Sequence, residues 1–223
     1  MYHETTLANG LRIVTETVPY AQSVVLGIWV DVGARDEADD EAGISHIIEH
    51  MLFKGTYRRT AQQIAEELDA VGGQLNAFTD KEYTCYYAKV LPEHLPLAMD
   101  VLADMLQHSR LDPEELEREK NVVLEEIKRH EDTPEDLVHD IFLRALWPGH
   151  PLGRPVIGRP EVVRRLQRDD LVRYLERYYT PDRLVVAAAG RIEHERVVAE
   201  VERHFGQRSG ERSAPRRHEA PHC

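Results

Sequence analysis

The sequence predicts an α+β fold in which helices pack on one face of a mostly antiparallel sheet. Segments typical of strands come in pairs joined by short polar turns, which favours hairpins over an alternating βαβ chain. Segments typical of helices follow one another in a block through the middle of the chain. The 223 residues, of which 42% are hydrophobic and 30% charged, suit a globular chain of one or two domains.

The expected strands form two hairpins and two single strands. The first hairpin spans residues 4–14 and turns at Asn9-Gly10, a dipeptide that suits a tight turn. Residues 23–32 are apolar on both faces of the strand, which predicts a central position in the sheet. The remaining expected strands are residues 74–79 and 83–90, which form the second hairpin, and residues 184–189.

The expected helices begin and end at residues with a physical reason to be there. Thr60 is a typical N-cap, and Gly72-Gly73 ends the helix that it opens. Asp112-Pro113 places a capping side chain and a proline directly before an acidic first turn. The predicted helices cover residues 44–55, 60–72, 92–109, 112–130, 133–146, 169–178 and 193–205.

The charge balance argues against a nucleic-acid partner. The net charge is −12, and because residues 208–223 hold four Arg and two Glu, the remainder carries −14. No apolar run approaches the roughly 20 residues of a membrane span, so no membrane partner is expected. Cys85 and Cys223 do not make a disulfide framework, and the N-terminus has no signal-peptide pattern. These features predict a cytoplasmic location, with export after cleavage of a signal as the alternative.

The segment from Ile44 to Phe53 carries the motif His-x-x-Glu-His and is the main candidate for a functional site. On a helix, His46 and His50 project from one face, one turn apart, and two neutral imidazoles there make half of a zinc site. Glu49 lies beside them, close enough to reach a metal-bound water without binding the metal. Apolar residues cover the other faces, so the helix should be buried nearly all round. The alternative is a pair of core histidines with hydrogen-bond partners.

A third metal ligand is expected on the helix of residues 112–130. Its periodicity places Glu119 and Glu126 in the middle of the buried face, and Glu117 and Glu125 on the opposite face. Two carboxylates on a buried face are costly unless they are paired or bind a cation. The alternative is that they meet a buried Arg or His of a neighbouring helix. The apolar residues that define this face are Leu116, Val122, Val123 and Ile127.

Four segments resemble the inverzincin zinc metallopeptidases, the family of pitrilysin, insulysin and the mitochondrial processing peptidase. They include Leu-Ala-Asn-Gly-Leu near the start, the histidine motif, and Gly-Gln-Leu-Asn-Ala-Phe-Thr after it. The resemblance implies a single copy of the half-domain of that family, its N-terminal zinc-binding half, in residues 1–207. Residues 208–223 are then expected to form a linker or a disordered tail. The matching segments are residues 7–11, 43–56, 73–79 and 117–127.

The resemblance also implies the roles of the site residues. The third zinc ligand of the family is a glutamate about 76 residues beyond the second histidine, and that position here is Glu126. One Zn²⁺ per chain is therefore expected, held by His46, His50 and Glu126. The catalytic residues implied are Glu49, which takes a proton from the zinc-bound water and passes it to the leaving amine, and Glu119, which supports the site.

The implied activity is that of a zinc endopeptidase or processing peptidase, with the peptide bound as an extra strand. Asn76, Ala77 and Phe78 are then expected to contact the substrate. His130 follows Glu126 by one helical turn and is expected to be a helix C-terminal histidine, with a residue that supports the site as the alternative. Family members carry two or four copies of the domain, so the expected partner is a second homologous domain or subunit, or a homodimer. Without it, the chain should hydrolyse peptides poorly. The alternative is a non-catalytic peptide-binding subunit of the same fold.

Overall fold

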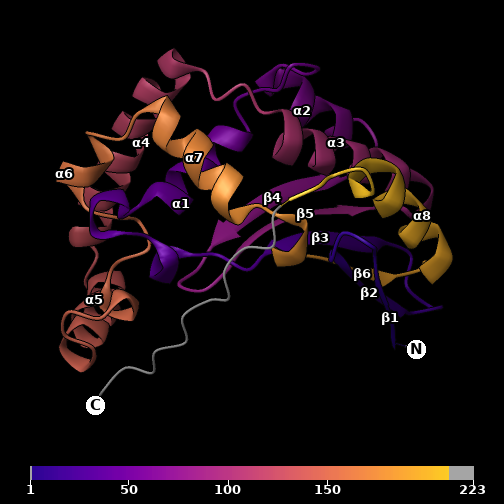
Figure 1. Ribbon diagram of the computed structural model, residues 1–223, viewed down its shortest axis with the longest axis horizontal. Helices are drawn as coiled ribbons and strands as arrows, with labels where there is room; N and C mark the ends of the chain where they lie inside the picture. The colour runs from indigo at the N-terminus through magenta and orange to yellow at the C-terminus, as the bar shows by residue number, and fades with distance from the viewer. Residues whose placement is uncertain (1, 211–223) are drawn as a thin grey trace.

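The computed structural model describes residues 2–210 and shows one six-stranded sheet with helices packed on one of its faces (Figure 1). The strand order across the sheet is β1-β2-β6-β3-β5-β4, so β1 and β4 are its two edges. The strands are β1 (Tyr2–Thr6), β2 (Arg12–Thr17), β3 (Val24–Val30), β4 (Gln74–Thr79), β5 (Thr84–Val90) and β6 (Leu184–Gly190).

The sheet is mostly antiparallel, as predicted, because β2 and β6 form the single parallel pair among its neighbouring strands. A parallel pair cannot be joined by a tight hairpin, and the chain between these two strands contains β3, β4 and β5 as well as most of the helices. The hairpin of β1 and β2 turns at Gly10, whose φ of 91° favours glycine. Strand β3 lies between β6 and β5, which confirms its predicted central position.

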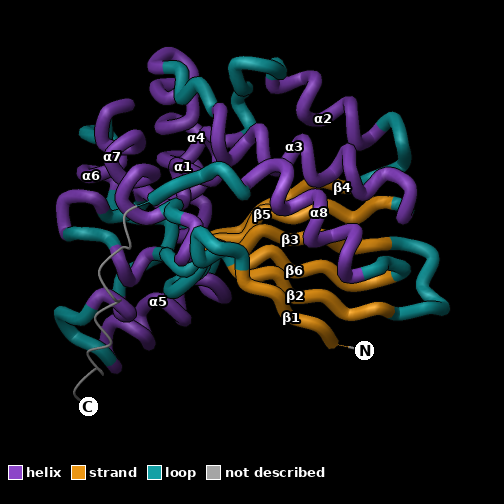
Figure 2. Tube along the Cα trace, turned by 45° about the vertical axis from the view of Figure 1, so that its right-hand side comes forward, coloured by secondary structure: helices purple, strands orange, loops and turns teal. Residues whose placement is uncertain are grey.

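The helices gather above the sheet, and no helix within residues 2–210 covers its other face (Figure 2). Seven of them match predicted helices to within a few residues. The four-residue α6 was not predicted, because a single helical turn has no periodicity to detect. The helices are α1 (Ile44–Leu52), α2 (Ala61–Asp69), α3 (Leu95–His108), α4 (Pro113–Glu131), α5 (Pro134–Leu146), α6 (Pro160–Val163), α7 (Arg168–Tyr178) and α8 (His194–Phe205).

The hydrophobic core fills the space between the sheet and the helical layer. Ile28 and Tyr86 from the central strands, Leu102 from α3 and Val201 from α8 are all fully buried there. Removing this apolar surface from water is the main source of stability for such a two-layer arrangement. The core therefore fixes the helices on the sheet, and α1 with them.

One residue of α4 departs from the predicted pattern. Leu116, Val123 and Ile127 are buried as expected, but Val122 is 44% exposed, so its assignment to the buried face was wrong. Lys120 is buried instead, with 3% of its surface exposed. The packed face of α4 is set by its contacts with α1 and α6, and the apolar character of one side chain does not reveal which side those helices cover.

Within residues 2–210, no helix is both long enough and apolar enough to cross a membrane.

The segment after α8 is still packed on the domain at Arg208. The Nη2 of Arg208 donates to the backbone oxygen of Tyr179 at 2.6 Å. The predicted linker or tail lies outside the described residues from 211 onward.

Candidate metal centre

Helix α1 presents His46, Glu49 and His50 on its least buried side. The side chains of the two histidines are 16% and 18% exposed, and their ring centroids are 4.7 Å apart. The helix is otherwise buried, which confirms the prediction from its apolar faces. The residues that are fully buried on those faces are Ile44, Ser45, Ile47, Ile48, Met51 and Leu52.

Helix α4 packs against α1 and brings Glu126 to the two imidazoles. Oε2 of Glu126 lies 3.9 Å from Nε2 of His46 and 3.6 Å from Nε2 of His50. The three side chains offer one ligand atom each, and these atoms lie within 4.8 Å of one another. Two ligands of one tetrahedral zinc ion lie about 3.3 Å apart. Small rotations of these side chains therefore suffice to place all three around one cation.

The protonation of His46 suits a metal ligand. Burial, with a smaller contribution from the neighbouring His50, lowers the pKa of His46 to about 4, so its ring is neutral at pH 7. Nε2 of the ring lies 3.9 Å from Oε2 of Glu126, which is too long for a hydrogen bond, so this nitrogen is open to another partner. Nδ1 is buried and has no hydrogen-bond partner among the described residues. In the tautomer with the proton on Nδ1, Nε2 presents the lone pair that a cation between His46 and Glu126 would take.

Glu119 orients the second histidine. Its Oε2 is 3.0 Å from Nδ1 of His50, and because a carboxylate only accepts, the ring donates from Nδ1, which in the neutral ring leaves the lone pair on Nε2. Nζ of Lys54 lies 2.7 Å from the other oxygen of Glu119, whose side chain is only 7% exposed. Glu119 therefore contacts both His50 and Lys54, and the contact with Lys54 was not predicted.

Glu49 has a different partner and faces open space. The hydroxyl of Thr79 donates to its Oε2 at 2.5 Å, which ties α1 to the end of β4. Burial raises the pKa of Glu49, while the hydrogen bond from Thr79 and the nearby His50 act in the opposite direction. A carboxylate whose pKa is moved towards neutrality is suited to accept and return a proton. Thr79 was seen in the sequence only as part of a strand.

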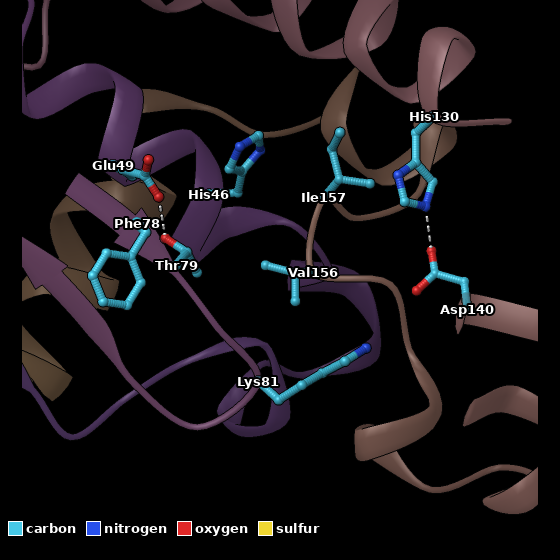
Figure 3. Close-up of a pocket in the computed structure, with 9 residues that line it drawn as sticks. All are labelled: His46, Glu49, Phe78, Thr79, Lys81, His130, Asp140, Val156 and Ile157. Carbon is cyan, nitrogen blue, oxygen red and sulfur yellow. Dashed lines mark hydrogen bonds and ion pairs between the residues drawn. The ribbon is translucent and has the colours of Figure 1, made fainter. Parts of the chain in front are cut away.

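A cavity of about 370 Å³ opens beside His46 and Glu49 (Figure 3). On its far side, Nε2 of His130 lies 2.8 Å from Oδ2 of Asp140, a contact that joins the last turn of α4 to α5. His130 is at the helix C-terminus as expected, and it also lines the cavity beside His46 and Glu49. Most of the lining was not predicted, because it comes from separate segments that no local pattern connects. The lining residues are His46, Glu49, Phe78, Thr79, Lys81, His130, Asp140, Val156 and Ile157.

Strand β4 lies at the edge of the sheet next to this cavity, with one side free of a neighbouring strand. The backbone N–H of Ala77 donates to Oδ1 of Asn76 at 2.8 Å, so it does not take part in the ladder with β5 and points to the free side. Phe78 is 38% exposed and contacts Trp29 on the face of the sheet that lacks helices. The structure thus places Asn76, Ala77 and Phe78 on an open edge.

Two histidines and a glutamate around one point, with another glutamate at a cavity, form the arrangement of a metal-dependent hydrolase. The sequence profile described as insulinase (peptidase family M16) matches residues 12–160, and that described as peptidase M16 inactive domain matches residues 165–222. The chain belongs to the peptidase M16 family, which confirms the family resemblance seen in the sequence.

Similar proteins are named as zinc proteases. "Uncharacterized zinc protease YmxG" of Bacillus subtilis is 51% identical over 201 residues, which cover 90% of this chain and 49% of that protein. "Probable mitochondrial-processing peptidase subunit beta" of Arabidopsis thaliana is 42% identical over 93% of this chain and 39% of its own length. The chain therefore spans about half the length or less of these relatives, and at the level of the family it is a metallopeptidase half-domain.

Solved structures support the same fold. A protease from Helicobacter pylori has a TM-score of 0.91 and 23% identity, covering all of this chain and 53% of its own. The first half of the periplasmic protease PqqL from Escherichia coli has a TM-score of 0.90 and 21% identity, covering 99% of this chain. At these identities the likeness shows the fold alone. The fold covers about half of each of these two chains, 53% and 49%, and the second chain is itself only the first half of PqqL.

Proposed function

We propose that this chain is the metal-binding half of a zinc-dependent endopeptidase that hydrolyses extended peptides. The observation that carries the proposal is the convergence of His46, His50 and Glu126 from two helices far apart in the sequence, with Glu49 beside them at a cavity. The names of the relatives support zinc as the metal. The neutral ring of His46 and the Glu119 contact to His50 support the same ligand set.

Metal binding and proton transfer are assigned to different residues of the chain. When bound by His46, His50 and Glu126, zinc supplies a Lewis acid that polarises the scissile carbonyl and lowers the pKa of a water. A carboxylate oxygen of Glu49 accepts the proton of the attacking water and returns it to the nitrogen of the leaving amine. The hydroxyl of Thr79, bonded to Oε2 of Glu49, holds this carboxylate towards the cavity.

The substrate is proposed to add to the free side of β4. The outward N–H of Ala77 would bond a peptide carbonyl in place of the Asn76 side chain, and Phe78 would contact substrate side chains across the open sheet face. Recognition through main-chain groups requires an extended peptide and places few demands on its sequence.

The experiment that tests this function compares wild type with Glu49→Gln on an unstructured peptide, with bound zinc measured in both. The amide cannot accept the proton, so we expect a loss of roughly 10²–10⁴-fold in kcat with one zinc per chain retained. Equal cleavage by the two proteins would remove Glu49 from this role.

A second candidate function is that of a non-catalytic peptide-binding subunit of the same fold. The open edge of β4 supports it, because its main-chain groups are available to a peptide without any contribution from the metal centre. In that case wild type and Glu49→Gln would bind the peptide equally and cleave it equally little. The presence of Glu49 at the cavity favours the peptidase.

A further inference from the structure

The helix that carries the metal centre begins at a residue that cannot cap it. Gly43 occupies the N-cap position of α1 with a φ of 100°, and it has no side chain to accept a hydrogen bond. A Cβ at this position would lie 2.8 Å from the Cα of Gly158, so the close approach of the two backbones excludes a larger residue. The free N–H groups of the first turn therefore need a partner from elsewhere.

Glu37 provides that partner from six residues earlier in the chain. Its carboxylate accepts the N–H of Gly43 at 2.7 Å and the N–H of Ser45 at 2.9 Å. Glu37 is only 4% exposed, which is unusual for a carboxylate, and these two bonds offset part of the cost of its burial. A negative group at this end of a helix also interacts favourably with the helix dipole.

Glu37 and the start of α1 are themselves held by two other segments. Nη1 of Arg154 donates to the backbone oxygen of Glu37 at 2.8 Å. The hydroxyl of Ser45 is 2.9 Å from that of Tyr174 on α7. The first turn of α1 is therefore fixed through hydrogen bonds to groups that are anchored in the rest of the domain.

We propose that Glu37 is a positioning residue for the metal centre, because its carboxylate sets where α1 begins and in which direction His46 points. His46 is the third residue of α1 and lies within the turn that Glu37 caps. A helix of 9 residues has few internal bonds to resist fraying at this end. Displacing one ligand by a fraction of an ångström weakens a metal site. The inference rests on the proposed metal centre and adds a residue outside its motif.

The test compares zinc affinity in Glu37→Gln and Glu41→Gln at pH 8, by competition with a chromophoric chelator. The amide in Glu37→Gln keeps one acceptor and turns an NH₂ towards a helix N–H, so we expect zinc binding roughly 10–100-fold weaker than wild type. Glu41 is the matched control, because its carboxylate accepts only the N–H of Ala38 in an exposed turn. Its variant should bind zinc within about twofold of wild type.

A merely structural role for Glu37 predicts a different result. Glu37→Gln would then unfold at a lower temperature without zinc, while its folded fraction would bind zinc as tightly as wild type, and that outcome overturns the inference. Wild type that binds no zinc would instead refute the proposed metal centre. The two failures are therefore distinguishable.

Hydrogen exchange on the wild-type protein gives a second test that does not depend on a variant folding. If the cap and the metal site are coupled, zinc must slow exchange at the amides of Gly43 and Ser45, because coupling acts in both directions. We expect at least a tenfold slowing at saturating zinc. Unchanged exchange at these two amides, with zinc bound, would contradict the coupling.

Discussion

At the scale of single residues, the candidate centre depends on polar side chains that each find one partner from a distant segment. Glu49 is bonded by Thr79, and His50 by Glu119. A buried polar group without such a partner costs free energy, so each contact both lowers that cost and fixes a direction. The orientation of the ligands is therefore built from contacts that lie outside the histidine motif.

Lys54 is expected to strengthen zinc binding through Glu119. Lys54→Met removes the ammonium that holds one oxygen of Glu119, so the other oxygen orients His50 less firmly. We expect zinc affinity to fall roughly 10–100-fold, and Lys54→Arg to restore most of it. Lys128→Met is the control, since Lys128 pairs with the exposed Glu125 on the far side of α4. Equal affinity in Lys54→Met and wild type would contradict this role.

The raised pKa of Glu37 makes the stability of the folded state depend on pH. Burial raises its pKa from 4.5 to about 7, outweighing the opposite effects of the Gly43 and Ser45 hydrogen bonds and of Arg154. The folded state therefore keeps a proton that the unfolded state releases. The stability from this group is fully present below pH 4.5 and is lost as the pH rises through 7, by about 3 kcal/mol.

Urea unfolding of wild type and Glu37→Gln at pH 5 and pH 8 measures this contribution. The amide does not titrate, so the stability advantage of wild type should shrink by up to about 3 kcal/mol at the higher pH. A difference between the two proteins that stays constant with pH would show that Glu37 does not titrate in this range.

At the scale of elements, strand β4 and helix α1 lie next to the same cavity but differ in exposure. The edge position of β4 leaves main-chain groups free, whereas α1 is buried on nearly every side. An exposed strand edge readily accepts another strand. In this structure the outward N–H of Ala77 donates to the side chain of Asn76. The helix supplies fixed ligands, and the strand supplies an adaptable surface.

Ala77→Pro tests whether the peptide adds to β4. Proline removes the outward N–H, and because that N–H is not in the ladder with β5, the sheet should remain intact. We expect KM for an unstructured peptide to rise about tenfold or more, with zinc affinity unchanged. Ala77→Val keeps the N–H and should behave like wild type. An unaltered KM in Ala77→Pro would place the peptide elsewhere.

Local sequence patterns predicted most of these helices and strands, because the contacts that begin and end them join residues a few positions apart. The cap at Thr60 accepts the N–H of Gln63 as its helix start requires, and Asp112 bonds the N–H of Glu114 and Glu115. Val122 shows where this reasoning fails. Periodicity identifies an apolar arc on a helix, but the neighbouring helices decide which part of that arc is covered.

At the scale of the whole molecule, one face of the sheet has no helical cover among the described residues (Figure 2). A shallow cavity of about 520 Å³ lies there, lined in part by Trp29, Phe78 and Tyr87. Apolar and aromatic side chains on an uncovered face are suited to a partner or a substrate. The length of the relatives is consistent with a second half that completes this side.

A homologous second half added in trans should therefore raise the rate of peptide hydrolysis. We expect kcat/KM to increase roughly tenfold or more, because a closed chamber orients the peptide and excludes water. Zinc affinity should change little, since all three proposed ligands come from this chain. No gain in rate, with complex formation verified by size-exclusion chromatography, would count against the need for a partner half.

The sequence by itself determined the helix of the histidine motif, the two hairpins, the caps and the identity of the three ligand candidates. Each depends on residues a few positions apart or on a family resemblance. Only the tertiary structure decided that Thr79 holds Glu49, that Lys54 holds Glu119, and that the start of α1 is capped by Glu37. Such contacts join segments whose proximity follows from the packing of the whole core, and a local pattern carries no information about that packing.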